Sequence, residues 1–424
     1  MVLAMEPEPI RFSEHPIRAK DIDSDALRVL ARLSDYGFYA YLVGGSVRDL
    51  LLGRKPKDFD VATSAQPDEI KRLFRRCRLI GRRFRLAHII GDKGQIIETA
   101  TFRAKPEDCG EAQLITDDNN FGTPRTDALR RDFTVNALFY DAQRQEVIDY
   151  VDGLEDLDNR LLRTIGDPVI RFREDPVRMM RAVKFAARLD FELEPSLRAA
   201  VVSQRAELGK AAVARLYEEI LRLLNGGAAA ESILLMDELR LLEVLIPEVS
   251  ATLARADDEQ YERIFNLLNT YDDVIAKGKK IPNGILLAGI LWPVVESVLA
   301  ELSSEIRPVQ ARELIEEITR PFAVRLSVPR RAMETALAVM ESQLRFDRIR
   351  RKRNARSGFA RTSHYAQSVC FAELRAQSGQ LTDTEIEAWA SLAQEFPPPP
   401  LFEKRTRGRR GHGRQRQRRG RQRR

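Results

Sequence analysis

Two glycines between an apolar run and a short helix-like run are the feature that most constrains the fold of this chain. Gly44 and Gly45 follow residues 38–43, which have the pattern of a strand, and precede residues 46–52, which have the pattern of a helix. Backbone N–H groups point outward at the first turn of a helix, and glycine lets a phosphate approach them closely. The pattern therefore predicts a strand–turn–helix unit that can hold a phosphate group.

A pair of carboxylates follows this turn. Asp58 and Asp60 stand in residues 58–63, a run that predicts a strand. Alternation along a strand places residues two apart on the same side, and two oxygen ligands beside a phosphate cradle suit Mg²⁺-dependent phosphoryl or nucleotidyl transfer. Taken alone, a glycine pair before a helix is commonly just a tight turn, and an Asp-x-Asp pattern is commonly a solvated strand edge. Their close spacing, with Arg48 and Asp49 between them, favours a nucleotide site.

Three further charged residues are candidates for the same site. Glu98 lies on the apolar side of a predicted strand, where a carboxylate needs a metal or a cation, so it is a candidate third metal ligand. A salt bridge from Glu98 to an arginine explains its position equally well. Arg131 and Asp132 precede the apolar run 133–138, where Arg131 could hold a phosphate and Asp132 could bind a ribose hydroxyl or join the acidic cluster. Taken alone, this pair also fits a helix start with a capping acid.

A carboxylate–guanidinium pattern follows later in the chain. At about 100° per residue, Glu174, Arg178 and Arg181 share one stripe of a predicted helix, with Asp175 on its flank and Pro176 in its first turn. A carboxylate beside a guanidinium offers one acceptor and one donor, which complements the base edges of adenine and cytosine but not those of guanine and uracil. The structural alternative is a set of ion pairs within the helix. The pattern does not separate adenine from cytosine.

The pattern of the chain changes from mixed to helical near residue 164. Before it, helix-like and strand-like runs alternate, beginning with a helix at residues 24–36 that has Ser24 as its expected N-cap. Residues 104–127 are polar and rich in Asp, Asn, Gly and Pro, and predict a loop over the active site. Leucine-rich helical spacing dominates from residue 174 onward. The most apolar run, 284–300, predicts a buried helix because it is short for a bilayer and contains a proline.

Positive charge is concentrated at the end of the chain. Residues 404–424 hold twelve Lys and Arg and no acid, so the +7 of the whole chain minus these twelve leaves −5 for the rest. Such a segment cannot bury enough apolar surface to fold alone, and it suits RNA or another polyanion. A solubility tail without a specific partner is the alternative. A second basic segment, 345–361, fits an RNA contact and an exposed helix face equally well.

Taken in order, these motifs resemble those of the bacterial poly(A) polymerase and CCA-adding enzyme family, class II of the polymerase-β-like nucleotidyltransferases. The resemblance implies that Gly44, Gly45 and Arg48 bind the nucleotide phosphates. It also implies that Asp58 and Asp60 bind Mg²⁺, with Mn²⁺ as an alternative, in a two-metal mechanism.

The same resemblance, which covers roughly residues 21–300, supplies the rest of the expected nucleotide site. Arg131 and Asp132 match the ribose and nucleotide motif, and Asp132 is counted with the catalytic acids. The residues that match the base-reading helix of the family are Glu174, Asp175, Arg178 and Arg181.

Within the family, the sequence resembles the poly(A) polymerase branch more than the CCA-adding branch. Residues 79–88, the neighbourhood of 291–293 and the Arg-rich extension carry this likeness, whereas Ser46 stands where that branch usually has a third glycine. The chain has no His-Asp dipeptide, so the phosphohydrolase domain of some CCA-adding enzymes is not expected. The implied function is addition of AMP from ATP to RNA 3′ ends without a template, releasing pyrophosphate and serving mRNA processing and decay. The alternatives are a CCA-adding, CC-adding or A-adding tRNA nucleotidyltransferase, a non-catalytic RNA-binding protein, and a transferase that adenylylates a protein or small molecule.

An α+β domain followed by helices is the expected architecture. Three scattered cysteines without a CxxC pair, and the lack of a signal-like start, indicate a cytoplasmic protein with reduced thiols and no membrane role. The expected units are an extension at 1–20, a nucleotidyltransferase palm domain with a small mixed sheet at 21–163, a neck of helices with the base-reading motif and RNA contacts at 164–228, a helical body with a C-terminal RNA-binding region at 229–402 and a disordered Arg-rich tail at 403–424.

Overall fold

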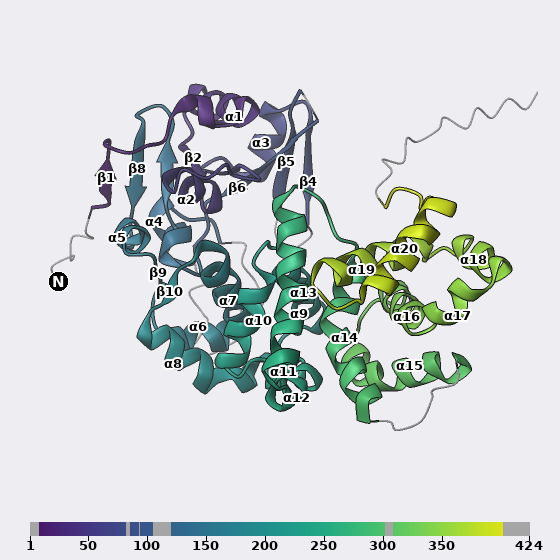
Figure 1. Cartoon of the computed structure of the whole chain (residues 1–424). Coiled ribbons are helices and arrows are strands. Elements are labelled where there is room, and N and C mark those ends of the chain that lie inside the picture. The colour runs from purple at the N-terminus through teal and green to yellow at the C-terminus, as the bar shows by residue number, and fades with distance from the viewer. Residues whose placement is uncertain (1–7, 82–84, 93, 105–119, 302–307, 402–424) are drawn as a thin grey trace, which may run out of the picture.

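A sheet-containing head and a long helical region make up the chain (Figure 1). The computed structural model describes residues 8–81, 85–92, 94–104, 120–301 and 308–401. The predicted α+β domain followed by helices is confirmed. The basic tail, 403–424, and most of the predicted loop, 104–127, lie outside the described residues. The end of that loop is a correction, because residues from Pro124 onward form a helix that Thr123 caps.

The head is built on an eight-stranded mixed sheet in the order β1-β8-β7-β2-β3-β6-β5-β4. Its neighbouring strands pair antiparallel, except that β3 and β6 run parallel. The strands are β1 (Ile10–Phe12), β2 (Ala40–Val43), β3 (Asp60–Thr63), β4 (Cys77–Ile80), β5 (Leu86–Ile90), β6 (Ile96–Thr101), β7 (Phe139–Asp141) and β8 (Glu146–Asp149). The parallel pair places residues of β3 beside residues of β6 at the centre of the sheet.

Short helices surround this sheet. They are η1 (Ala19–Asp21), α1 (Ser24–Asp35), α2 (Gly45–Leu51), α3 (Pro67–Leu73), α4 (Pro124–Leu129), η2 (Thr134–Asn136) and α5 (Gly153–Asp158). Helix α1 is capped by Asp23 rather than by Ser24, because the Asp23 carboxylate accepts the N–H of Asp25 at 2.7 Å and of Ala26 at 3.4 Å. Asp23 and Ser24 are both residue types that cap helices. Asp23 is the N-cap because its backbone is not helical, whereas Ser24 is already the first residue of the helix.

The two faces of the sheet pack against different partners. Leu42 and Val61 belong to the large core that α1 and α3 complete on one face. Tyr41 and Ala62, each one residue away, point to the opposite face and join a smaller core with Ala128 of α4. Alternation along a strand produces this division. Even-numbered residues of β3 therefore lie on the side of the sheet that carries the smaller core. Asp60 is one of them, so its side chain lies on that side.

Helices, together with the short parallel strands β9 and β10, form the rest of the described residues. The elements from the end of the head to the body are β9 (Leu161–Leu162), α6 (Pro168–Glu174), α7 (Val177–Leu189), β10 (Glu192–Leu193), α8 (Pro195–Gln204), η3 (Arg205–Lys210), α9 (Val213–Leu224), α10 (Ala229–Glu238), α11 (Leu242–Leu245), α12 (Pro247–Arg255) and α13 (Asp258–Ala276). The remaining elements are α14 (Asn283–Glu301), α15 (Pro308–Arg325), α16 (Arg330–Leu344), α17 (Phe346–Arg351), α18 (Arg353–Ala360), α19 (Tyr365–Gln377) and α20 (Asp383–Glu395).

One large apolar core runs from the head into the helical body, and a separate one lies under the last helices. The large core extends from Ile17 to Leu374. The separate core is built around Phe346 and Trp389, whose rings stack with centroids 3.7 Å apart. The predicted buried helix at 284–300 is confirmed as α14, although Pro293 lies inside it. No helix in the described part of the chain is long and apolar enough to cross a membrane.

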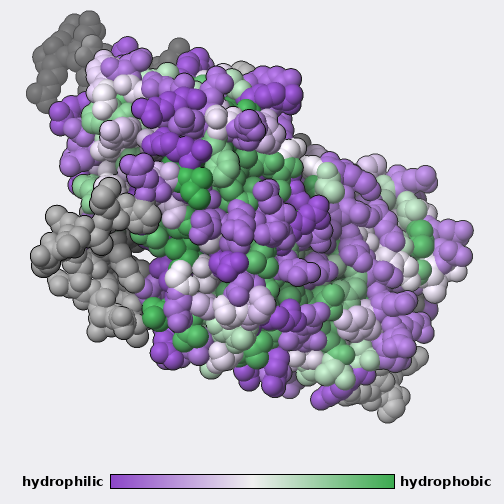
Figure 2. All heavy atoms as spheres, turned by 90° about the vertical axis from the view of Figure 1, so that its left-hand side faces the viewer, coloured by the Kyte–Doolittle hydropathy of each residue, from purple (hydrophilic) through white to green (hydrophobic). Residues whose placement is uncertain are grey.

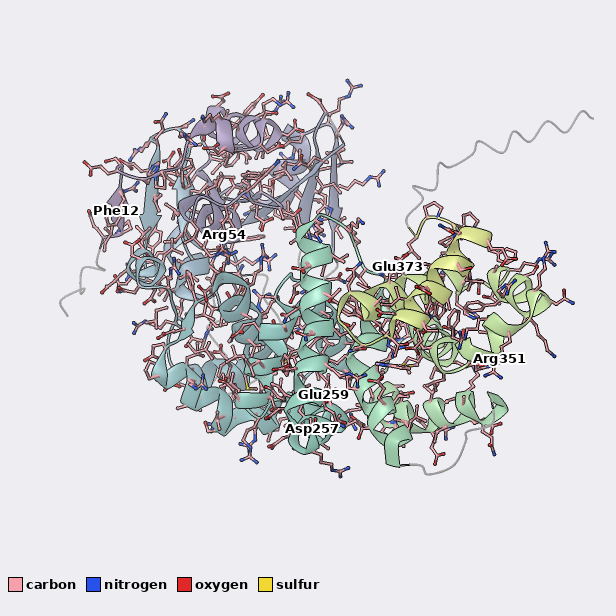
Figure 3. All side chains as sticks on the ribbon, viewed as in Figure 1. Phe12, Arg54, Asp257, Glu259, Arg351 and Glu373 are labelled. Atoms are coloured by element: carbon pink, nitrogen blue, oxygen red, sulfur yellow. The ribbon has the colours of Figure 1, made fainter. Side chains whose placement is uncertain are left out.

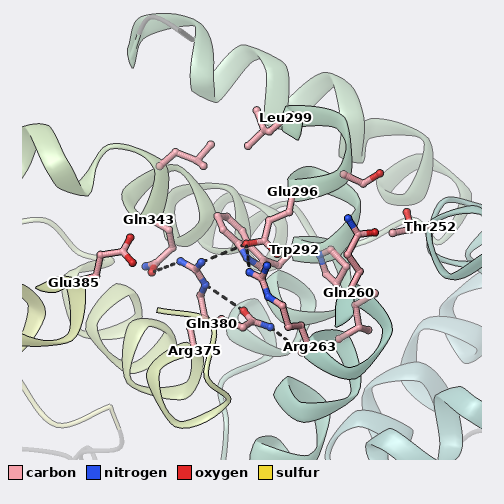
Figure 4. Close-up of a pocket in the computed structure, with 14 residues that line it drawn as sticks. Thr252, Gln260, Arg263, Trp292, Glu296, Leu299, Gln343, Arg375, Gln380 and Glu385 are labelled. Carbon is pink, nitrogen blue, oxygen red and sulfur yellow. Dashed lines mark hydrogen bonds and ion pairs between the residues drawn. The ribbon is translucent and has the colours of Figure 1, made fainter. Parts of the chain in front are cut away.

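A cavity of about 360 Å³ lies between the body and the last helices (Figure 4). Buried Arg375 of α19 lies 4.4 Å from the ring centroid of Trp292 on α14. Its guanidinium donates to Gln343 and Gln380, each at 3.3 Å, and pairs with Glu296 at 3.4 Å. This network ties α14 to α16 and α19. The lining residues belong to none of the predicted nucleotide motifs.

Candidate active site

The predicted strand–turn–helix unit is present. Strand β2 ends at Val43, Gly44 turns the chain with φ +70° and ψ −132°, and α2 begins at Gly45. Positive φ favours glycine here, and an added Cβ on Gly44 would lie 3.0 Å from Arg131 Nη1. The Ser46 hydroxyl donates to the Val43 carbonyl at 3.1 Å. The Arg131 guanidinium and the Asn136 carbonyl therefore border the turn closely.

Asp60 lies beside this turn. The predicted strand begins at Asp60 rather than Asp58, but burial still alternates, with Phe59 buried between two exposed aspartates. Asp60 pairs in register with Val43 on one side and with Glu98 on the other. The sheet thus brings the turn and the acids together, as the sequence predicted.

The electrostatic surroundings of Asp60 disfavour its charge. Although the side chain reaches solvent, protein atoms surround it closely, and this burial, followed by the negative charge of Glu98, raises the pKa of Asp60 to about 6. Arg131 acts in the opposite direction, and Asp58 adds a smaller unfavourable contribution. Carboxylates crowded in this way are typical of sites that receive a cation.

Glu98 occupies the neighbouring position on β6. Its carboxylate is 49% exposed and lies 3.4 Å from Nε2 of His88, on the adjacent strand β5. Among the described residues, no group of three or more His, Cys, Asp or Glu side chains is arranged to hold a metal ion. The possible role of Glu98 as a third ligand therefore stays a prediction. Asp58 and Asp60 are exposed hard oxygen donors, and this pair fits a divalent cation such as Mg²⁺.

Arg131 connects the turn with the acids. Its guanidinium donates to the buried Asp127 carboxylate at 2.8 and 3.2 Å and to the Asn136 carbonyl at 3.2 Å. Asp127 also pairs with Arg130 at 3.0 Å. Burial raises the pKa of Asp127, but the two guanidinium groups outweigh this effect and lower it overall. The charged Asp127 thus holds Arg131 beside Gly44, with a fifth of its side chain exposed.

Arg48 is buried rather than free to meet solvent. Its guanidinium pairs with Asp49 at 2.6 and 2.9 Å and also donates to the Asn136 side chain. Burial lowers the pKa of Arg48, and Asp49 opposes that shift. Its Nη2 would lie 3.5 Å from a Cβ on Gly45, so the residue does border the turn. Its expected contact with phosphate stays a prediction.

Asp132 joins the head to α7. Its carboxylate pairs with Arg181 at 2.5 and 2.7 Å and accepts from the Phe133 N–H at 3.0 Å and from Asn136 at 3.3 Å. Burial raises its pKa, but Arg181 and these hydrogen bonds outweigh burial and lower it overall. Asp132 and Arg181 thus form an ion pair with each other. The catalytic role of Asp132 stays a prediction.

The predicted base-reading helix is divided. Glu174 ends α6 and Pro176 precedes α7, which corrects the expectation of one helix, because a proline nitrogen cannot donate to the preceding turn. Glu174 is buried and pairs with Arg171 at 2.8 Å and Arg178 at 3.0 Å. The internal ion pairs that were the alternative explanation are therefore present, and base reading remains a prediction.

Two of the partners found here were missed in the sequence. Asp175 makes a bidentate pair with Arg215 of α9, at 2.7 and 2.9 Å. Arg171 donates to the Arg130 carbonyl at 2.7 Å. The spacing of Arg171 three residues before Glu174 was a usable signal, whereas Arg215 lies 40 residues from its partner and left none.

Known proteins share both parts of this architecture. Residues 40–163 match the family described as "Poly A polymerase head domain", and residues 190–253 match "Probable RNA and SrmB- binding site of polymerase A". Poly(A) polymerase I of Salmonella typhi is 37% identical over 404 residues, covering 91% of this chain and 85% of that protein. This chain belongs to the bacterial poly(A) polymerase family. It is therefore an enzyme of the nucleotidyltransferase class.

Related CCA-adding enzymes match a smaller part of the sequence. The CCA-adding enzyme of Levilactobacillus brevis is 44% identical over 209 residues, which are 48% of this chain and 51% of that protein. The solved CCA-adding enzyme of Bacillus stearothermophilus in complex with CTP has a TM-score of 0.51 at 26% identity, covering 88% of this chain and 96% of that one. The poly(A) polymerase family and these enzymes thus share the head and the helical arrangement.

Proposed function

We propose that this enzyme extends RNA 3′ ends with AMP from ATP without a nucleic acid template. The 3′-oxygen would attack the α-phosphorus, the bond from that phosphorus to the bridging oxygen would break, pyrophosphate would leave, and the attacking hydroxyl would lose its proton. The observation that carries the proposal is the share of this chain over which its sequence is similar to each kind of enzyme. Sequence similarity to the Salmonella typhi poly(A) polymerase I runs through 91% of the chain, whereas sequence similarity to the Levilactobacillus brevis CCA-adding enzyme covers 48% of it. The fold of a CCA-adding enzyme matches 88% of the chain, so the sequence comparison is the one that separates the two activities.

The residues around the Gly44 turn would bind the nucleotide. Gly44, Gly45 and Arg131 would contact the phosphates, because neither glycine carries a side chain that would cover the backbone N–H groups and the Arg131 guanidinium lies beside the turn. Asp58 and Asp60 would hold Mg²⁺, with Mn²⁺ as an alternative. A bound divalent cation lowers the pKa of a hydroxyl it binds and offsets negative charge on phosphate.

The junction of α6 and α7 would recognise adenine. Glu174 holds one side of the Arg178 guanidinium, so the arginine is fixed in one orientation from which its remaining donors could meet a base. Asp175 directly follows Glu174 in the sequence, and its side chain is 22% exposed. Asp132 and Arg181 would fix this helix against the phosphate site. The basic tail would grip RNA through its backbone, and the enzyme would act in cytoplasmic mRNA processing and decay.

A CCA-adding activity is the second candidate. Identity of 44% in the region shared with the Levilactobacillus brevis enzyme favours it, since the head and neck contain every nucleotide motif discussed above. Such an enzyme would also use CTP and would stop after a few additions.

A single assay separates the two. The purified chain is incubated with Mg²⁺, each NTP in turn and either a generic RNA oligonucleotide or an RNA with a tRNA-like end, and products are resolved to one nucleotide. A long ladder with ATP alone is expected. Addition that stops after one to three residues, and only on tRNA-like ends, would show the CCA-adding activity instead, and no incorporation with any NTP would contradict both.

A further inference from the structure

The ring of Phe185, on α7, is surrounded by positive charge. The Cζ atoms of Arg48 and Arg181 lie 5.3 and 5.4 Å from its centroid, and Nζ of Lys184 lies 5.1 Å away. The edge of the ring packs against Phe133 of the head, with centroids 5.8 Å apart and planes at 77°. Cations within about 6 Å of an aromatic face are attracted by its negative potential.

Each of these cations has a carboxylate of its own. The pairs are Arg48–Asp49 at 2.6 Å, Arg181–Asp132 at 2.5 Å and Lys184–Glu219 at 2.7 Å. Glu219 is almost fully buried on α9 and also pairs with Arg222 at 2.5 Å. Three cations around one ring repel each other in a low dielectric, and the carboxylates compensate for this repulsion. The arrangement is therefore an ordered cluster, not a chance crowding of basic residues.

The cluster lies where α7 meets the head. The Arg54 guanidinium donates to the last carbonyls of α7, at 3.1 Å to Arg188 and 3.3 Å to Leu189, and Figure 3 shows Arg54 at this boundary. Arg188 also lies 3.7 Å from Asp49 of α2. Phe185 is placed between these contacts and the Asp132–Arg181 pair. Its ring contacts a guanidinium from each side of the boundary.

Two of the three cations belong to the nucleotide motifs. Arg48 borders the Gly45 turn, and Arg181 holds Asp132. Both guanidinium groups are planar and could rotate about their side-chain bonds, so a flat aromatic surface limits the orientations available to them. Removal of the ring would loosen both groups at once while leaving every ion pair chemically possible.

We propose that Phe185 is a positioning residue for nucleotide binding, whose ring orients Arg48 and Arg181 and so couples α7 to the phosphate-binding turn. The inference rests on the proposed function. Because the ring touches arginines and not the acids at Asp60, its loss should weaken ATP binding more than it slows the chemical step.

The test compares ring-free and ring-keeping variants of the full chain. For Phe185→Leu, KM for ATP and the equilibrium Kd for ATP should rise about tenfold, while kcat changes less than about threefold. Phe185→Tyr keeps the ring and should restore both constants to within about twofold of the unchanged chain. If Phe185→Leu does not fold, Phe185→Met supplies a ring-free side chain that adapts to the same space.

A matched control separates positioning from packing. Phe191 lies just beyond the same helix and is buried among apolar side chains. Phe191→Leu should lower the melting temperature as much as Phe185→Leu does, without raising KM or Kd for ATP. An unchanged KM and Kd in Phe185→Leu would overturn the proposal. Increases in Phe191→Leu or in Phe185→Tyr as large as those in Phe185→Leu would overturn it as well. Failure of the unchanged chain to incorporate AMP would contradict the proposed function instead, while the Kd comparison would still decide the role of Phe185.

Discussion

Asp60 lies on the sheet close to both a negative and a positive side chain. Its neighbours in register are Val43, next to the glycine turn, and Glu98, whose charge works against its own. Arg131 supplies the opposing positive charge. A carboxylate whose ionisation is disfavoured in the folded protein lowers the stability of the fold when it is charged. Such unfavourable positions of charged groups occur most often at functional sites.

Replacement of Asp60 by asparagine keeps its size and removes its charge. Asp60→Asn should lower kcat for AMP incorporation about 100-fold or more, because a metal ligand would be lost. The melting temperature should stay the same or rise, since repulsion from Glu98 disappears. Asp68→Asn, at an exposed position of α3, is the control and should leave kcat unchanged. Near-normal incorporation by Asp60→Asn would refute the metal assignment.

Gly44 can be tested against a second glycine that also has a positive φ. Gly37 has φ +83° and Gly44 has φ +70°, but an added Cβ meets nothing within 4 Å at Gly37 and lies 3.0 Å from Arg131 at Gly44. Gly37→Ala should lose about 1 kcal/mol of stability. Gly44→Ala should lose more, because φ +70° with ψ −132° is a conformation that almost only glycine adopts. Only Gly44→Ala should also raise KM for ATP, by several-fold. Equal KM values in the two variants, measured together with their unfolding free energies, would remove the turn from the site.

Among the elements, those set by local pattern were predicted and those set by distant contacts were not. The strand and helix around Gly44 are as expected, because alternation and turn residues report burial locally. The start of β3 at Asp60 depends on which strands pair with it. The Asp132–Arg181 pair joins residues 49 positions apart, and periodicity along one element carries no information about such a partner.

Arg178 tests the junction of α6 and α7 as a recognition element. Arg178→Lys keeps the charge but cannot bind Glu174, the Arg171 carbonyl and a base together. The ratio of kcat/KM for ATP to that for GTP should fall about tenfold. This ratio is insensitive to a loss of folded protein. Arg215→Lys, which alters the Asp175 pair, serves as a comparison. An unchanged ratio in Arg178→Lys would exclude base reading by this residue.

At the scale of the whole molecule, the head and body share one core and the last helices have their own. One face of the molecule is mostly hydrophilic, with smaller apolar areas scattered over it (Figure 2). The sequence alone indicated the change from mixed to helical structure. It did not reveal that the core continues through that boundary, because apolar spacing does not say which helices meet.

The basic tail is expected to act as an RNA grip. Replacing residues 404–424 by a Gly/Ser/Gln segment of the same length removes twelve positive charges. RNA binding should weaken, and the slope of log Kd against log salt should decrease by about 0.7 for each phosphate that the tail no longer neutralises. KM for ATP should not change. A salt slope identical to that of the full chain would show that the tail does not bind RNA.

We propose that this enzyme adds adenylate, and only adenylate, to RNA that carries no special end. The most direct measurement offers the full chain a generic RNA oligonucleotide with all four NTPs at equal concentration and sequences the added tails. The proposed activity predicts tails of many residues that consist almost entirely of A. Short additions that begin with C, or tails of mixed composition, would contradict it.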